Sequence, residues 1–223
     1  MILENFIFDI SQETAQLCDE FRYAYLYLYS LEKAELKSKH NAFFVDNVGQ
    51  DNEYNVVYDI TTLPPEKFPL ITAFRETEVG KMLGYAAFFT ETDTRADQLE
   101  ILDYLDMHKH VESTALINFP LVNCDERTTI GFHILTPEEE SNTHLCDLGG
   151  VYLTNDRWYK EPDFTISSYD NKPFILNAQQ WHSVDNQTKA RRIVAGWYFT
   201  RDTVWEDLLE SIREVRKNAQ LDV

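Results

Sequence analysis

The sequence predicts a mainly β fold, a sandwich or jelly roll with one helical segment before it and one after it. Three observations lead to this prediction. The middle of the chain holds many short β-prone runs separated by turn residues. Helical periodicity is confined to the two ends. Strands do not alternate with long helical runs, as they would in a parallel α/β sheet.

The length of 223 residues fits one domain with a sizeable core. We expect a strand and a helix over residues 1–40, the β core over 41–200 and a second helix over 201–223. Hydrophobic residues make up 43% of the chain and aromatic residues 13%, which is typical of a globular protein.

The first segment combines a short strand at Phe6–Phe8 with one helix that begins at Ser11 and runs to about Lys39. Apolar residues recur along it at helical spacing. The last segment predicts one amphipathic helix from Asp202 to Gln220, with Asp202 as its cap and an apolar side. That apolar side comprises Val204, Leu208, Leu209, Ile212 and Val215.

Between these helices the strand-like runs follow one another closely. We expect a short helix or coil at 68–74, and loops at 137–142 and 144–147. The predicted strands are 43–45, 54–60, 80–91, 99–107, 115–122, 128–135, 151–153, 165–167, 174–176 and 192–199.

Charge and cysteine content limit the function classes. The formal net charge of −18 disfavours nucleic acids and anionic membranes as partners, because both need a basic surface. The three cysteines have no C-x-x-C spacing, which is typical of reduced thiols in the cytosol. No signal peptide or membrane-spanning stretch is evident, so we expect a cytoplasmic protein.

The segment around His182 is the first candidate site. It predicts two strands around a polar turn at 186–189, with Arg192 ten positions after the histidine. If both side chains point to the inner face, the imidazole can bind a metal and the guanidinium can hold a carboxylate. The alternative is a structural histidine beside a surface charge.

A second group of candidate ligands lies at 108–112. In an extended segment His108, His110 and Glu112 share one face. Two of them with His182 give two imidazoles and one carboxylate, a triad that leaves coordination positions of iron(II) open for an oxo acid and dioxygen. The alternative is a solvated polar loop.

Further candidates lie on the predicted strand 128–135. Thr129 and His133 share a face, so either could line a cosubstrate pocket, although a hydrogen-bonded core histidine is the alternative for His133. Trp181 is expected to pack behind the metal site as an apolar wall. The segment 144–147 has metal-ligand residue types but no second pair at zinc-finger spacing.

Two motifs resemble one known superfamily. His110-Val111-Glu112, five residues and then the strand beginning Asn118-Phe119 resemble the metal motif of iron(II)- and 2-oxoglutarate-dependent dioxygenases. The spacing of His182, Asn186 and Arg192 is similar to the distal half of the aspartyl/asparaginyl β-hydroxylase and prolyl-hydroxylase-like groups. The resemblance covers roughly residues 99–199.

The resemblance implies a double-stranded β-helix core of the jelly-roll, cupin-like kind. It also implies iron(II) bound by His110, Glu112 and His182, with 2-oxoglutarate as cosubstrate. Arg192 would hold its distal carboxylate, with Arg191 as the competitor. Where this chain has Glu112 the family usually has aspartate, so His108 could donate instead, or Glu112 could bind with an adjusted backbone.

The function implied is hydroxylation of a C–H bond in a small molecule or a peptide side chain. One alternative is a jelly-roll binding module without catalysis. Another is a cupin-like enzyme that uses a different divalent metal with the same ligands.

Overall fold

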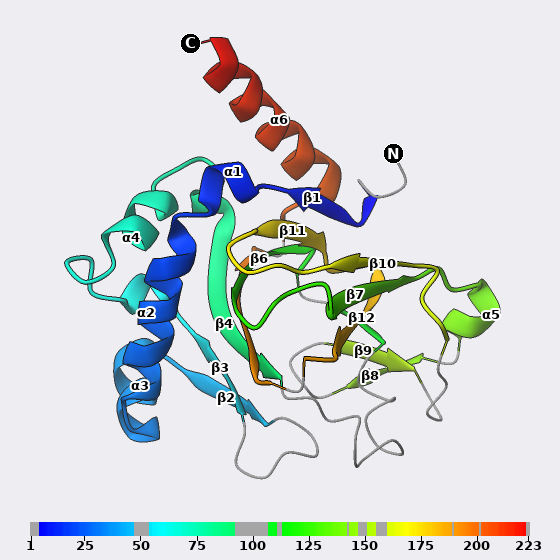
Figure 1. Cartoon of the computed structure of the whole chain (residues 1–223), viewed down its shortest axis with the longest axis horizontal. Coiled ribbons are helices and arrows are strands. Elements are labelled where there is room, and N and C mark those ends of the chain that lie inside the picture. The colour runs from blue at the N-terminus through cyan, green and yellow to red at the C-terminus, as the bar shows by residue number, and fades with distance from the viewer. Residues whose placement is uncertain are drawn as a thin grey trace.

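The computed structural model describes most of the chain, with gaps at both ends and in several connections (Figure 1). The described residues are 5–46, 54–91, 107–110, 113–141, 143–146, 151–154, 160–188, 190–200 and 202–221. The predicted strand 99–107 falls almost entirely outside them.

Two antiparallel sheets form the body of the described chain. The seven-stranded sheet has the order β1-β11-β6-β13-β4-β3-β2, and the six-stranded sheet has the order β10-β7-β12-β5-β9-β8. The strands of the first are β1 (Ile7–Asp9), β2 (Phe43–Asp46), β3 (Tyr54–Tyr58), β4 (Leu83–Glu91), β6 (Ala115–Val122), β11 (Phe174–Asn177) and β13 (Arg192–Phe199). Those of the second are β5 (His108–His110), β7 (Thr128–His133), β8 (Thr143–Cys146), β9 (Val151–Thr154), β10 (Phe164–Ser167) and β12 (Trp181–Asn186).

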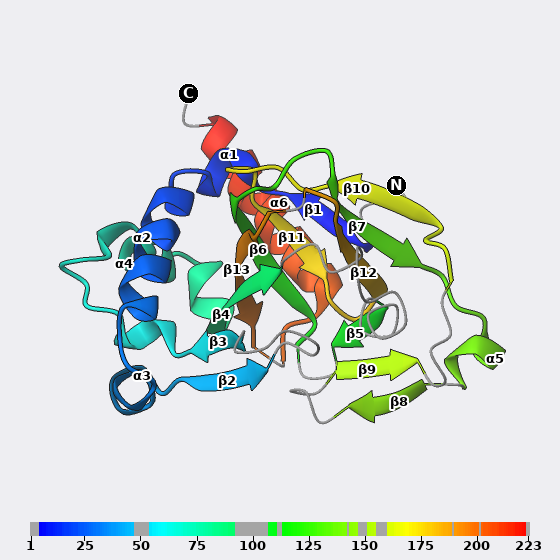
Figure 2. The ribbon, with the colours of Figure 1, turned by 60° about the horizontal axis from the view of Figure 1, so that its bottom comes forward.

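Eight of these strands make a jelly roll. β4, β13, β6 and β11 are neighbours in one sheet, and β5, β12, β7 and β10 are neighbours in the other. The chain crosses between the sheets at most connections, so strands that are consecutive in sequence face each other. The predicted mainly β, jelly-roll fold is therefore confirmed, with β1, β2 and β3 extending one sheet and β8 and β9 the other (Figure 2).

The β12–β13 connection differs from the prediction. The sequence predicts that the strands of His182 and Arg192 form a hairpin, but the structure places them in opposite sheets. β12 pairs with β5 and β7, whereas β13 pairs with β4 and β6. A tight polar turn is compatible with either outcome, because the tertiary contacts of the second strand decide its partner.

Helices cover the outer face of the seven-stranded sheet (Figure 1). They are α1 (Ser11–Thr14), α2 (Leu17–Tyr29), α3 (Lys33–His40), α4 (Pro69–Arg75) and α6 (Trp205–Leu221), with 3₁₀ turns η2 (Ile60–Thr62) and η3 (Gly80–Met82) nearby. The single helix expected from Ser11 to Lys39 is thus three helices. The second break follows Ser30, whose hydroxyl donates to the Tyr27 carbonyl and competes with the helical pattern.

Two further segments differ from the sequence prediction. Residues 137–142 were expected to be a loop, but α5 (Pro137–Glu140) forms there, and Thr136 and Glu139 close a capping box at its start. Residues 143–146 form strand β8 instead of a loop. The last helix was expected from Asp202, but α6 begins at Trp205, so Val204 precedes it. The middle of the expected apolar side is buried, whereas Val204 and Val215 are exposed.

The core has two parts because both faces of the seven-stranded sheet are covered. Outward residues of β13 such as Ala195 and Trp197 pack with Phe21 of α2 and Leu208 of α6. A second cluster lies between the sheets, where Phe132 of β7 meets residues of β6 and β11. We call the face of each sheet that looks at the other sheet its inner face.

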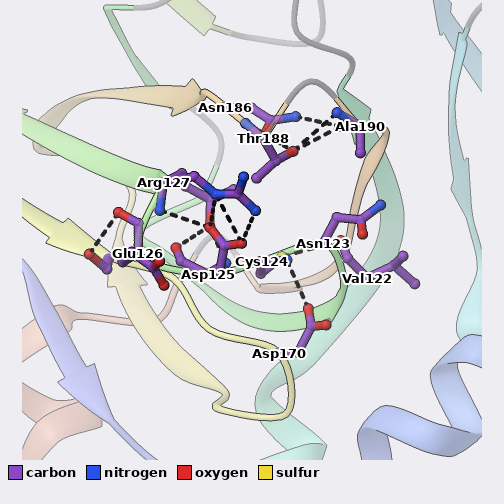
Figure 3. Close-up of polar contacts among 12 residues, drawn as sticks. Val122, Asn123, Cys124, Asp125, Glu126, Arg127, Asp170, Asn186, Thr188 and Ala190 are labelled. Atoms are coloured by element: carbon purple, nitrogen blue, oxygen red, sulfur yellow. Dashed lines mark hydrogen bonds and ion pairs between the residues drawn. The ribbon is translucent and has the colours of Figure 1, made fainter.

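Three turns close one end of the roll (Figure 3). Gln187 donates its backbone N–H to the Arg127 carbonyl at 3.0 Å, and Asp170 donates to the Cys124 carbonyl at 2.9 Å. The side chain of Asn123 donates to the Arg191 carbonyl at 2.7 Å. These bonds join the β6–β7, β10–β11 and β12–β13 connections, so we call this the turn end. Among the described residues, no helix has the length and apolar character needed to cross a membrane.

Candidate metal centre

Three histidines meet on the inner face of the six-stranded sheet, away from the turn end. His108 and His110 lie two positions apart on β5, so their side chains point to the same side. His182 lies on β12 directly opposite His108. The backbone N–H of His110 donates to the Ala178 carbonyl at 2.8 Å, which fixes β5 against the chain leading into β12.

The three rings are close enough to share one cation. Ring centroids are separated by 4.3 Å for His108 and His182, and by 5.4 Å for His110 and His182. One nitrogen of each ring lies within 4.8 Å of the others. Three such atoms lie at most about 2.8 Å from a common point, against the roughly 2.1 Å of a metal–imidazole bond, so small side-chain rotations close the site.

The hydrogen bonding of His182 leaves one of its nitrogens available. Its Nδ1 lies 2.8 Å from the Gln180 carbonyl oxygen, which can only accept, so Nδ1 carries the proton. The lone pair of the ring is then on Nε2. A histidine oriented in this way by a backbone carbonyl is the usual state of a metal ligand.

Burial keeps the imidazoles of His110 and His182 neutral. Burial lowers the pKa of His110 to about 3, and neighbouring His108 acts in the same direction. Burial also lowers the pKa of His182 well below its ordinary value, with further contributions from His108 and His110. A neutral imidazole is the form that binds a metal ion, so His110 and His182 need no deprotonation at neutral pH.

The structure brings together two of the three predicted ligands, His110 and His182. The third, Glu112, lies outside the described residues. His108, which the sequence suggested only as a substitute, completes the described cluster. The sequence allows this placement of His108 to be predicted, because His108 and His110 are two positions apart in an extended segment and so share a face.

The structure separates the two arginines that compete for the carboxylate-binding role. Arg192 is 2% exposed at the turn end of β13, whereas Arg191 is exposed just before the strand. Alternation along β13 places Arg192 on the same face as Tyr198, whose ring lies 5.8 Å from that of His110. Arg192 therefore points between the sheets, toward the interior that the histidines also face.

Thr129 and His133 do share a face, but it is the outer one. His182 lies directly opposite Phe132, and Phe132 packs between the sheets. The residues on either side of Phe132 on β7 therefore point away from the histidines. The imidazole of His133 instead lies 2.9 Å from the Ser183 hydroxyl, and burial lowers its pKa to about 4.

Trp181 also lies on the outer face, immediately before His182. Its indole N–H donates to Glu140 at 3.0 Å, so it packs behind the strand rather than beside the rings. His144 forms part of β8, and nothing further is described of its side chain.

Sequence reasoning missed Tyr198 as a lining residue. Its ring contacts the ring of His110 and, at 6.3 Å between centroids, that of Phe89 on β4. Burial raises the pKa of its hydroxyl, which is therefore protonated at neutral pH and can donate a hydrogen bond. The signal was present, because Tyr198 follows Arg192 by an even number of positions in one strand.

Comparisons with known proteins give structural matches alone. The search against family models found no match. The search of curated proteins found none either. Solved structures that match include an oxidoreductase of the 2OG-Fe(II) oxygenase family from Burkholderia pseudomallei, with 9% identity, coverage of 76% of this chain and 79% of that one, and a TM-score of 0.40.

Two further matches act in nogalamycin biosynthesis. The non-heme alpha ketoglutarate dependent carbocyclase SnoK has 12% identity, coverage of 78% of this chain and 85% of that one, and a TM-score of 0.37. The epimerase SnoN has 12% identity, coverage of 87% and 76%, and a TM-score of 0.45. The residues of the site, rather than these similarities, carry the proposal that follows.

Proposed function

We propose that this protein is an iron(II)- and 2-oxoglutarate-dependent oxygenase that hydroxylates a substrate C–H bond. The observation that carries the proposal is the convergence of His108, His110 and His182 at one end of a jelly roll. Imidazole donors with open positions opposite them suit a non-heme iron centre. The motif spacing described above supplies the choice of cosubstrate.

The residues present fit a divalent transition metal. All three donors are imidazole nitrogen atoms; His182 is buried, and His108 and His110 are half-buried. His110 and His182 are two of the ligands in this proposal. The third is Glu112, as the motif implies, or His108, which already lies beside them.

Bound iron(II) with 2-oxoglutarate and dioxygen supplies the oxidising chemistry, and succinate and carbon dioxide are the coproducts. The protein orients the cosubstrate. Arg192 is buried at the turn end of β13, on the inner face of the opposite sheet, where its planar guanidinium can take a carboxylate through two parallel hydrogen bonds. The ring of Tyr198, 5.8 Å from that of His110, lines the same interior.

The substrate in this proposal is a small molecule or a peptide side chain, as the resemblance implies. The all-imidazole cluster favours a second candidate, a cupin-like enzyme that uses another divalent metal with His108 as the third ligand. The two candidates differ in whether 2-oxoglutarate binds to the metal.

Anaerobic titration with iron(II) and then 2-oxoglutarate tests the proposal. We expect a weak visible charge-transfer band that is absent in His182→Ala and weakened in Arg192→Ala. Arg191→Ala is the matched control and should keep the band. Succinate formed under air, measured with and without added substrates, then reports turnover.

Two results would count against the oxygenase. Metal binding without a 2-oxoglutarate band would favour the second candidate. A folded protein that binds no divalent metal would contradict both and leave a binding module without catalysis.

A further inference from the structure

The outer face behind the metal centre carries a small polar cluster joined by one carboxylate. Glu140, at the end of α5, accepts a hydrogen bond from the Trp181 indole at 3.0 Å. The same oxygen, Oε1, lies 3.2 Å from the Lys109 ammonium. That ammonium also lies 5.0 Å from the centre of the Trp181 ring, within range of a cation–π contact.

The two residues that Glu140 holds are the backbone neighbours of the three histidines. Lys109 lies between His108 and His110 on β5, and Trp181 immediately precedes His182 on β12. Because side chains alternate along a strand, a residue held on the outer face fixes the direction in which its neighbours point inward. One carboxylate thus fixes both strands that carry the imidazoles.

The helix that presents Glu140 is itself anchored. Thr136 and Glu139 form a capping box at the start of α5, and Pro137 occupies its first turn. Next to the helix, the backbone N–H of Ile134 donates to Asp163 at 2.6 Å, and Lys160 donates to the Ile134 carbonyl at 2.5 Å. Glu140 is therefore held by a short, well-capped element and not by a long flexible loop.

The contact between β5 and β12 is short. Only His108 pairs with β12 by register, although β9 pairs with all three residues of β5 and the His110 N–H donates to the Ala178 carbonyl. Lys109 is the one residue of the strand that points outward. Metal sites tolerate displacements of only about 0.5 Å in their ligands, so a modest change in the tilt of β5 moves His108 and His110 relative to His182 by a relevant amount.

We propose that Glu140 is a positioning residue of the metal centre, which acts through Lys109 and Trp181 to align the imidazoles of β5 with that of β12. This proposal rests on the proposed metal centre, but not on 2-oxoglutarate or on the identity of the substrate. The hydrogen bond from Trp181 lowers the pKa of Glu140, and Lys109 acts in the same direction. The carboxylate therefore stays ionised at neutral pH.

Titration with cobalt(II), followed by its visible ligand-field spectrum, tests the proposal without turnover. We expect Glu140→Ala to weaken cobalt(II) binding about three- to tenfold, below or at the low end of the roughly 10–100-fold given by a group bonded directly to a ligand. The band positions should shift because the ligand geometry changes. Trp181→Phe, which keeps an apolar ring but removes the donor, should act in the same direction.

Matched variants separate positioning from general stability. Glu138→Gln removes one negative charge from the same helix and should leave the affinity and the spectrum unchanged. The ion pair of Glu140 is partly exposed, so the melting temperature of the metal-free Glu140→Ala protein should stay close to that of the wild type. The double variant Lys109→Met/Glu140→Ala should bind cobalt(II) no more weakly than the weaker-binding single variant. Both substitutions break the same Lys109–Glu140 interaction, so their effects should not add.

Unchanged cobalt(II) affinity and spectrum in a folded Glu140→Ala protein would overturn the proposal, and so would an equal loss in Glu138→Gln. Additive losses in the double variant would also contradict it. A wild-type protein that binds cobalt(II) with the expected dependence on Glu140, yet forms no succinate, would refute the oxygenase and leave the positioning role intact. A wild-type protein that binds no cobalt(II) would refute both.

Discussion

The two faces of the six-stranded sheet around His182 use the same strands in different ways. On the inner face, imidazoles from β5 and β12 face one another with one nitrogen of each within 4.8 Å of the others, close enough to hold one cation. On the outer face, the indole of Trp181 and the ammonium of Lys109 meet the acceptor Glu140. Consecutive residues of a strand point to opposite faces, so the face on which a side chain lies decides its role here.

The histidines themselves make the same point. His133 is as deeply buried as His182 and also has a lowered pKa, but its partner is a hydroxyl on the outer face. Residue type and burial do not distinguish a structural histidine from a ligand. Its position relative to a second and third imidazole does.

The largest expected effect is a difference in metal affinity between a variant that lacks an inner-face histidine and one that lacks an outer-face histidine. His182→Ala should weaken cobalt(II) or zinc(II) binding by more than about 100-fold, because it removes a ligand and not merely a supporting group. His133→Gln, which keeps a polar group near Ser183, should leave metal affinity within about threefold. Calorimetric titration measures both, and a similar loss in the two variants would abolish the distinction between the faces.

The pH dependence of stability should reveal the outer-face histidine. The pKa of His133 falls from an ordinary value of 6.5 to about 4 in the folded protein, mainly through burial. The unfolded chain therefore takes up this proton first as pH falls. The contribution to stability is complete above pH 6.5 and is lost as pH falls toward 4, by roughly 3 kcal/mol in all.

Urea unfolding of the metal-free protein at several pH values between 7 and 4 measures this loss. His133→Gln should give a shallower decline than the wild type over that range, since glutamine does not titrate. Equal slopes in the two proteins would show that His133 gains its proton equally well when folded.

In the seven-stranded sheet, two glycines differ in the space around them: Gly196 on β13 is tightly packed, whereas Gly84 on β4 is not. A Cβ added at Gly196 would lie 2.4 Å from the Phe89 ring and 3.4 Å from Leu116. Gly196→Ala should therefore lower the free energy of unfolding by about 1–3 kcal/mol through overpacking. At Gly84 the nearest atoms would lie 3.9 Å away, so Gly84→Ala should be neutral or slightly stabilising.

Chemical denaturation of both glycine variants provides the measurement. If Gly196→Ala is as stable as Gly84→Ala, the inner face of β13 has more room than the structure implies.

The smallest expected effect concerns the support of Glu140. Thr136→Ala removes the hydroxyl that caps α5 and should cost about 1 kcal/mol locally. Hydrogen exchange of the α5 amides measures that local loss, and cobalt(II) affinity should fall less than in Glu140→Ala. Thr136→Ser keeps the hydroxyl and should behave as the wild type in both measurements.

Most of the β strands could be predicted from the sequence because their β-prone runs lie between clear turn signals, as at 115–122 and 192–199. The breaks in the first helical segment could not, because Ser30 and its neighbours have no strong helix-breaking signal. The helix α5 could have been found, since Thr136, Pro137 and Glu139 form a capping box with proline in the first turn.

Part of the candidate site could also be predicted, because strand alternation fixes which residues share a face. Alternation correctly placed His108 and His110 on one face. The role of Arg192 stays a prediction, and its strand lies in the sheet opposite that of His182. The face of His133 could have been predicted, because Ile130 and Phe132 point to one side of β7 while Thr129, Gly131 and His133 point to the other. That second side has no large apolar residue, which marks it as the outer one. Pairing of β13 with β4 and β6 depends on contacts across the whole molecule.

The central place of β13 has a consequence for how the protein is made. It lies between β4 and β6 in the seven-stranded sheet, although both precede it by at least 70 residues. Until that segment leaves the ribosome, two long apolar strands keep unpaired edges, which is the situation in which nascent chains aggregate or recruit chaperones. Because the same strand carries Arg192 and Tyr198, a partly synthesised chain lacks both side chains, and the interior between the sheets is complete only after β13 joins β4 and β6.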